Sequence, residues 1–236
     1  MWSGPRNIST AMLRAWGNRA DTLVADEPFY ASYLARTGKR HPIAEEVIAA
    51  GETDWRKVAT SLTTATFPPG KTIFYQKQMT HHLLPEMERG WLAGLTNCFL
   101  IRDPAEVIVS YSRKNGDPRL EDLGFVQQAE IFDWVRRRTD RVPPVIDARD
   151  VLQDPERLLR LLCAEIGVGF DSAMLSWPPG LRDSDGIWAK HWYGEVAQST
   201  SFQPPRAQSV TVPDHLREID RCCREPYERL HAARLH

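Results

Sequence analysis

The segment Cys98-Phe99-Leu100-Ile101-Arg102-Asp103-Pro104-Ala105-Glu106 passes directly from an apolar run into the start of a helix. Its first four residues are typical of a buried strand. Asp103 suits the N-cap of the following helix, Pro104 suits its first position, and Glu106 stands where a reciprocal cap forms. The segment therefore predicts a strand followed at once by a helix, with Arg102 at the carboxyl end of the strand.

The same alternation of short apolar runs and longer helical patterns continues on both sides of this segment. The periodicity predicts strands at 22–25, 72–76, 98–101 and 145–147, and helices at 9–18, 55–65, 104–114, 123–139, 155–166 and 214–235. Strands and helices that alternate in this way form a parallel sheet covered by helices. We therefore expect an α/β fold, a three-layer sandwich with a central, mostly parallel sheet flanked by helices, in a single domain over residues 1–236.

The late segment, residues 176–213, differs from the rest in composition. Trp, Pro, Gly, Ser and Asp replace the periodic apolar pattern there. Such composition favours irregular structure, and loops of this length commonly serve as lids or binding segments. We expect a long loop or lid.

The stretch Ser3–Thr10 predicts a phosphate-binding loop at the other end of the chain. A Gly-Pro turn precedes two hydroxyl residues that lead into an apolar helical pattern. Unpaired N–H groups at a helix N-terminus attract an anion, and Arg6 adds a charged, forked donor. A plain turn followed by a capped helix has the same pattern. The loop is not a Walker motif, because no Lys precedes Ser9.

Composition limits the partners. The 236 residues carry 30 Lys and Arg against 31 Asp and Glu, a net charge of −1. This balance gives no global reason to expect nucleic acid or an anionic membrane as partner. No run approaches the roughly 18 apolar residues of a membrane span, and no secretory signal is visible. The four cysteines lack metal-ligand spacing. We expect a cytoplasmic protein that needs no metal, and the oligomeric state stays open.

Arg102 and Ser110 form a second candidate anion site. Ser110 lies about two helical turns beyond the expected N-cap, and open α/β sheets bind ligands outside the carboxyl ends of their strands. An ordinary Arg–carboxylate contact and an ordinary helical serine would explain this pair equally well when it is taken alone.

Taken together, the two segments resemble the nucleotide-binding signature of the sulfotransferase family. The family's P-[RK]-S-G-T-T loop aligns with Pro5, Arg6, Asn7, Ile8, Ser9 and Thr10. The spacing from Arg102 to Ser110 matches the family's second motif. The resemblance implies that the loop holds the 5′-phosphosulfate of 3′-phosphoadenosine 5′-phosphosulfate (PAPS) and that Arg102 and Ser110 hold its 3′-phosphate. It implies sulfuryl transfer to a hydroxyl or amino group of a small acceptor, which leaves 3′-phosphoadenosine 5′-phosphate (PAP).

Three positions depart from the family pattern. Asn7 and Ile8 replace the usual Ser-Gly, which reduces backbone freedom in the loop. Ala11 stands where many soluble members have an adenine-stacking Trp. Either adenine stacking or simple packing of the late segment would account for Trp188, Trp192 and Tyr193. By resemblance to the family's late basic loop, Lys190 or His191 is expected to reach the 3′-phosphate.

The transfer also needs positioned donors and a base. By analogy with phosphoryl transfer, Arg6, Ser9 and Lys77 are expected to stabilise charge on the transferring group. Glu27 is the favoured base, because its segment resembles the one that carries the base glutamate in carbohydrate-modifying sulfotransferases.

His81 or His82 is the alternative base. In soluble small-molecule sulfotransferases the histidine position aligns with Met79, so both histidines stand two or three residues late. Each candidate base also has a purely structural explanation. Glu27 could be a carboxylate that the helix dipole favours at a helix start, and His81 and His82 could be a solvated pair in a loop.

Two other functions fit parts of the sequence. One is a P-loop small-molecule kinase that uses ATP, against which the missing Walker lysine counts. The other is a nucleotide-binding protein without catalysis, which the altered residues Asn7 and Ile8 would suit.

Overall fold

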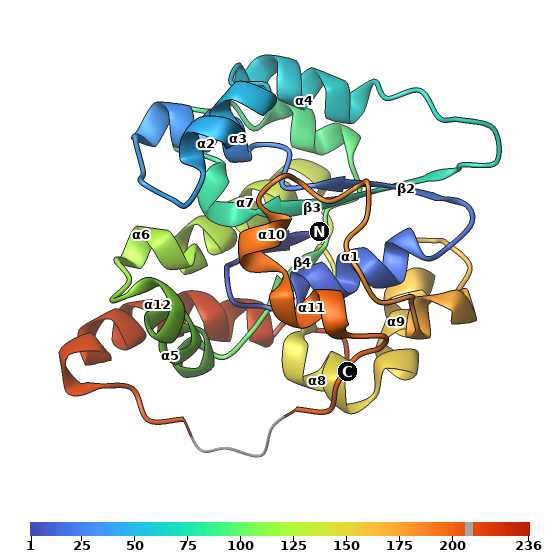
Figure 1. Cartoon of the computed structure of the whole chain (residues 1–236). Coiled ribbons are helices and arrows are strands. Elements are labelled where there is room, and N and C mark those ends of the chain that lie inside the picture. Colours follow the sequence, from blue (N-terminus) through green and yellow to red (C-terminus); the bar gives the residue numbers. More distant parts are fainter. Residues whose placement is uncertain (206–209) are drawn as a thin grey trace.

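A five-stranded sheet forms the middle layer of the computed structural model, which describes residues 1–205 and 210–236 (Figure 1). The strand order is β2-β3-β1-β4-β5, and every pair within this part of the chain is parallel. The strands are β1 Trp2–Ser3, β2 Thr22–Asp26, β3 Ile73–Met79, β4 Phe99–Ile101 and β5 Val145–Asp147. The predicted α/β sandwich is confirmed.

The helices follow the strands in alternation and cover both faces of the sheet (Figure 1). They are α1 Ser9–Gly17, α2 Tyr30–Thr37, α3 Ala44–Ala50, α4 Trp55–Thr63, α5 Pro104–Asn115, α6 Leu120–Leu123, α7 Phe125–Thr139, α8 Ala148–Gln153, α9 Pro155–Glu165, α10 Ala189–Trp192, α11 Gly194–Gln198 and α12 Arg217–His231. Single 3-10 turns occur at η1 Thr80–His82, η2 Gly90–Gly94, η3 Ser172–Leu175 and η4 Asp214–Leu216.

Strand β4 shows how the sheet divides the hydrophobic core. Leu100 packs with Trp16 of α1 and Leu159 of α9. Phe99 points to the opposite face and packs with Phe132 of α7. Alternate side chains of a strand face opposite sides of a sheet, and a parallel sheet is buried on both. This explains why β4 reads as an unbroken apolar run rather than as an alternating one.

The helix predicted over 123–139 is present as α7, but it begins two residues later. Gly124 adopts φ 74°, which ends α6 and lets the chain restart as α7. A side chain at Gly124 would be strained by the positive φ, and its Cβ atom would clash with the Thr80 hydroxyl. The prediction also missed α2, α3 and α8, which are short, and it ended the strand that begins near residue 73 three residues before Met79.

The late segment is more regular than predicted. Instead of one long loop it contains α10 and α11, and Ser176 pairs with Ser201 in an isolated antiparallel bridge. The part of the predicted loop at 206–209 lies outside the described residues. In Figure 1 the helices α10 and α11 lie across the sheet near α1.

The central strand β1 is two residues long. It is held from both sides, because Trp2 N donates to Cys98 O (2.8 Å) and Gln78 N donates to Met1 O (2.9 Å). The Gln128 side chain of α7 adds bonds to the carbonyls of Trp2 and Leu100. These bonds place the loop after β1 between the carboxyl ends of β3 and β4.

No helix in residues 1–205 and 210–236 is long and apolar enough to cross a membrane.

Candidate functional site

The loops at the carboxyl ends of the strands line one cavity of about 1430 Å³. Arg6 enters it after β1, Glu27 after β2, His81 after β3 and Arg102 after β4. This edge is where open α/β sheets bind ligands. The cavity brings together the predicted residues Pro5, Arg6, Asn7, Ile8, Ser9, Thr10, Glu27, Lys77, His81, His82, Arg102 and Ser110.

Lys190 is the exception among the predicted site residues. It is exposed on α10 and is not among the residues that line the cavity, whereas its neighbours His191 and Trp192 are. Lys114 of α5 lies there instead, four residues after Ser110 and so on the same helix face. Of the two late basic residues expected from the family, Lys190 is therefore outside the cavity and His191 lines it.

Two cavity residues have unusual backbone conformations. Arg6 adopts φ 54° and Glu27 adopts φ 43°, and they are two of the four non-glycine residues with positive φ in the described part of the chain. Such conformations cost about 1–3 kcal/mol and cluster at functional sites. Both turns direct a charged side chain from the end of a strand into the cavity.

Asn7 and Ile8 fit the loop without the family's glycine. The positive φ falls on Arg6, while Ile8 has φ −85°, a value open to any residue. The Asn7 amide donates to Leu100 O (3.1 Å), and its oxygen accepts from Ile8 N (2.8 Å). Asn7 thus ties the loop to β4, so the loop is held in place although Asn7 and Ile8 depart from the family pattern.

The first turn of α1 faces the cavity with free donors. No residue of the described chain accepts a hydrogen bond from the N–H groups of Ser9, Thr10 or Ala11. Neither hydroxyl caps the helix, because the N-cap is Ile8 and no side chain caps it. Helix N-termini with free N–H groups bind anions.

On the β4 side of the cavity, which we define by Arg6, Arg102, Ser110 and Lys114, cations come together. Arg6 Nε donates to Ser110 Oγ (2.9 Å), and Arg102 Nη1 donates to Arg6 O (2.6 Å). Burial lowers the pKa of Arg6, Glu195 opposes this effect, and the neighbouring Arg102 lowers the pKa further. A bound anion would relieve the repulsion between the two guanidinium groups.

Glu106 links this side to a further arginine. Asp103 caps α5 as predicted, accepting from Ala105 N at 2.9 Å. Glu106 does not complete the predicted reciprocal cap. Its carboxylate instead accepts from Arg102 Nε (2.9 Å) and from Arg149 of α8. These two ion pairs, one local and one tertiary, offer it charged donors, which a backbone N–H does not match.

On the β2–β3 side, which we define by Asp26, Glu27, Lys77, His81 and His82, the central group is a buried lysine. Lys77 Nζ donates to Asp26 Oδ1 (2.9 Å), Glu27 Oε1 (2.6 Å) and the Tyr193 hydroxyl (2.6 Å). Its side chain is 1% exposed. Burial alone would lower the pKa of Lys77, but Asp26 and Glu27 outweigh it and hold that pKa well above the ordinary value. Lys77 is an ammonium whose three donors are all engaged.

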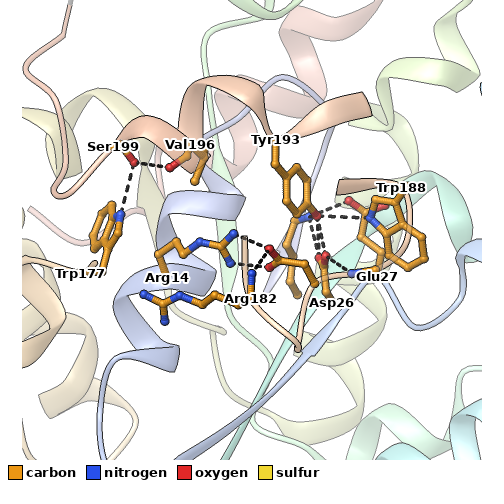
Figure 2. A network of polar contacts seen from close by, with 12 residues as sticks. Arg14, Asp26, Glu27, Trp177, Arg182, Trp188, Tyr193, Val196 and Ser199 are labelled. Atoms are coloured by element: carbon orange, nitrogen blue, oxygen red, sulfur yellow. Dashed lines mark hydrogen bonds and ion pairs between the residues drawn. The ribbon is translucent and has the colours of Figure 1, made fainter. Parts of the chain in front are cut away.

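Tyr193 brings the late segment into this network (Figure 2). Its hydroxyl donates to Asp26 Oδ2 at 2.6 Å. Asp185 of the same segment forms a buried bidentate pair with Arg14 of α1, at 2.5 and 2.6 Å. Trp188 packs edge-on against Tyr30. The late segment is therefore held to the body by charged contacts as well as by apolar packing.

His81 and His82 are buried rather than solvated. Both line the cavity, and His82 stacks between Tyr30 (4.9 Å) and Tyr33 (4.6 Å). Burial lowers the pKa of both imidazoles well below the ordinary value. Their Nδ1 atoms have no hydrogen-bond partner within the described chain. At neutral pH the pair is uncharged.

Two of the late aromatic residues, Trp188 and Tyr193, lie on the β2–β3 side, whereas Trp192 lies between the two sides. Tyr193 is bound to Asp26 and Lys77, and Trp192 contacts His41 and the Lys114 ammonium. An apolar wall stands elsewhere in the cavity, where Ala11, Leu152 and Phe202 line it and pack on one core cluster.

Sequence reasoning missed several residues of the site. Asp26 directly precedes Glu27 at the end of β2, so its position was a usable signal. Lys114 could also have been predicted from the sequence, since it follows Ser110 by one helical turn. Arg149 and Phe202 carry no local signal, because their place in the cavity depends on the packing of α8 and of the late segment.

Comparison with known proteins gives a consistent result. A family model described as "Sulfotransferase domain" matches residues 1–221. The solved sulfotransferase domain of the Synechococcus PCC 7002 olefin synthase has a TM-score of 0.52 at 18% identity, covering 96% of this chain and 92% of that one. A sulfotransferase domain of the curacin biosynthetic pathway has a TM-score of 0.48 at 14% identity, covering 99% and 90%. The first of these likenesses supports the fold.

Two proteins of Arabidopsis thaliana are similar in sequence. "Branched-chain-amino-acid aminotransferase-like protein 1" is 33% identical over 213 residues, and "Branched-chain-amino-acid aminotransferase-like protein 2" is 31% identical over 214. The match covers 90% of this chain in both cases, but 38% and 37% of the relatives. The chain thus spans less than two fifths of their length.

Proposed function

The chain belongs to the sulfotransferase domain family, and we propose that it transfers the sulfuryl group of PAPS to a hydroxyl or amino group of a small acceptor. The observation that carries the proposal is the pairing of Arg6 with Ser110 beside Arg102, which joins the two predicted anion sites. A nucleotide that carries a phosphosulfate on the 5′-oxygen of its ribose and a phosphate on the 3′-oxygen needs two such sites in one cavity.

The residues of the β4 side fit such a nucleotide. The free N–H groups of α1 and the Arg6 guanidinium suit the 5′-phosphosulfate. Arg102 and Ser110 suit the 3′-phosphate, with Glu106 orienting Arg102. We assign the adenine to the apolar wall that includes Leu152 and Phe202. When bound, PAPS supplies an activated sulfuryl group.

The residues of the β2–β3 side suit the acceptor. Glu27 lines the cavity with a side chain that is 13% exposed, and its carboxylate can accept the proton of an acceptor hydroxyl or amine. Lys77 fixes that carboxylate through the 2.6 Å bond to Oε1. Since all three Lys77 donors are engaged, we assign Lys77 to positioning Glu27 and leave charge stabilisation to Arg6 and the α1 donors. His81 and His82 stay the alternative base.

The names of the plant relatives raise amino-group transfer as another possibility. A lysine that condenses with a carbonyl must present a neutral amine. The two carboxylates beside Lys77 keep its pKa well above the ordinary value. The buried cavity lysine is therefore unsuited to that chemistry.

Nucleotide binding tests the proposal most directly. Calorimetry should show that PAP binds more tightly than adenosine 5′-phosphate, and that Arg102→Ala weakens PAP binding about 10- to 100-fold, the value of a charge-assisted contact. Arg160→Ala is the matched control, because Arg160 forms an exposed pair with Glu156 on α9, outside the cavity. Equal affinity for the two nucleotides would rule out the 3′-phosphate site.

Turnover separates the remaining functions. Transfer of sulfate from PAPS to any acceptor, lost in Glu27→Gln with PAP binding retained, would exclude a non-catalytic binding protein. Magnesium-dependent turnover of ATP in place of PAPS would favour the kinase.

A further inference from the structure

We propose that Tyr193 is a positioning residue for the base, because its hydroxyl fixes Asp26 and Lys77 so that Lys77 is shared between two carboxylates. The inference rests on the proposed function in one respect, the role of Glu27 as proton acceptor. It assigns to the late segment a part in building the acceptor site.

The geometry places the Tyr193 hydroxyl at the centre of the network (Figure 2). It accepts from Lys77 Nζ at 2.6 Å, and it lies 2.6 and 2.8 Å from the two Asp26 oxygens, to which it donates its single proton. Tyr193 is 4% exposed and Asp26 is 8% exposed. A buried network of this kind specifies one arrangement, because water cannot replace a lost partner.

The charges explain what this arrangement does for Glu27. With both carboxylates ionised, Asp26, Glu27 and Lys77 together carry one excess negative charge. If Asp26 took up a proton, the Lys77 ammonium would pair with Glu27 alone. A carboxylate with its own undivided cation is a weaker base. Sharing Lys77 therefore keeps Glu27 able to accept a proton.

Tyr193 opposes the protonation of Asp26. Burial raises the pKa of Asp26, while Lys77 lowers it, Glu27 raises it and the Tyr193 hydrogen bond lowers it. Besides Lys77 and Tyr193, Gly186 N also points at this carboxylate, at 3.4 Å. Removing the Tyr193 hydroxyl should therefore raise the pKa of Asp26.

The other titratable groups around this network are neutral or neutralised by a partner. On α1, Arg14 is neutralised by Asp185. On the acceptor side, burial keeps the imidazoles of His41 and His82 below their ordinary pKa. Tyr30 and Tyr75 have pKa values raised by burial and stay neutral.

The network is completed only by a residue of the late segment. Asp26, Glu27 and Lys77 come from the ends of the adjacent strands β2 and β3, but Tyr193 lies between α10 and α11. The base therefore acquires its full set of partners when the late segment is docked on the body.

Tyr193→Phe tests the proposal, with Tyr75→Phe as matched control. Tyr75 is buried on β3 two residues before Lys77, and its hydroxyl has no partner within the described chain, so removing it leaves the network intact. Carbon-13 NMR of the carboxyl groups, assigned with Asp26→Asn and Glu27→Gln, measures the pKa of Asp26 without any turnover. We expect a higher Asp26 pKa in Tyr193→Phe and no change in Tyr75→Phe.

Kinetics give the second readout. In Tyr193→Phe we expect kcat to fall by about tenfold or more, as for one lost charge-assisted bond, and the acid limb of kcat/KM to move to higher pH. PAP affinity should stay close to that of Tyr75→Phe, because the β4 side is untouched. In an Asp26→Asn background, Tyr193→Phe should not move the acid limb further, because the group it controls is gone.

An unchanged Asp26 pKa in Tyr193→Phe, or an acid limb that moves equally in the Asp26→Asn background, would overturn the proposal. Absence of turnover in the wild type would contradict the proposed function instead. The NMR titration would still decide the role of Tyr193.

Discussion

The two sides of the cavity differ in their electrostatics. On the β4 side, Arg6 and Arg102 lie together with partly exposed side chains, so positive charge is concentrated there. On the β2–β3 side, Lys77 is buried between carboxylates, and two buried histidines are neutral. Binding energy for a charged nucleotide and proton transfer to a base require these different environments. The comparison predicts which substitutions affect affinity and which affect rate.

Glu27→Gln should have the largest effect of any single change. It keeps the shape of the side chain but removes the group that accepts the proton, so kcat should fall about 10²- to 10⁴-fold. PAP affinity, measured by calorimetry, should stay within about threefold, because the β4 side is untouched. Glu45→Gln on the exposed face of α3 is the control. A loss of PAP affinity as large as the loss of kcat would mean that the two sides are not separate.

The success of sequence reasoning differs between the two sides for the same physical reason. Arg6, Ser110 and Arg102 belong to local strand-to-helix segments. Such segments can be recognised in the sequence from their capping residues and from the spacing of residues along the helix. The structure indeed brings these three side chains together.

The partners of Glu27 were much harder to predict. Lys77 was identified, but its role depends on Tyr193, which lies 116 residues away in the chain. A contact of that kind depends on tertiary packing of a segment without periodic pattern. The burial of His81 and His82 was missed for a similar reason, because the rings of Tyr30 and Tyr33 that cover them come from α2. That helix was not predicted.

The neutral histidines should make stability depend on pH. Their pKa values are lowered in the folded protein, so below about pH 6.5, the ordinary value, the unfolded chain binds more protons. The free energy of unfolding should therefore fall as pH drops below 6.5, by up to about 1.4 kcal/mol per pH unit for each histidine. Above that pH these residues should contribute no slope.

Urea unfolding between pH 7.5 and 5 measures this slope. His81→Gln and His82→Gln should each remove part of it, even where the substitution lowers stability overall. His215→Gln is the control, because His215 is exposed and pairs with Asp117 at the surface. If the wild type and His82→Gln lost stability with the same slope, burial of a neutral His82 would be wrong.

The smallest effects distinguish two lysines, Lys114 on the β4 side and Lys190 outside the cavity. Lys114 lines the cavity one turn beyond Ser110, and burial together with nearby Arg6 lowers its pKa. Lys114→Ala should weaken PAP binding about three- to tenfold, the value of a partly exposed charge contact. Raising the salt concentration should reduce the difference.

Lys190→Ala should change PAP affinity less than twofold, although Lys190 is one of the two late basic residues, with His191, that the family resemblance selected. Both lysines are exposed at the surface, so the comparison holds side-chain type and exposure constant and varies only their relation to the cavity. If Lys190→Ala had the larger effect, the late segment would have to move on nucleotide binding and carry Lys190 to the phosphate. In that case the Tyr193 contact seen here would describe the protein before the nucleotide binds.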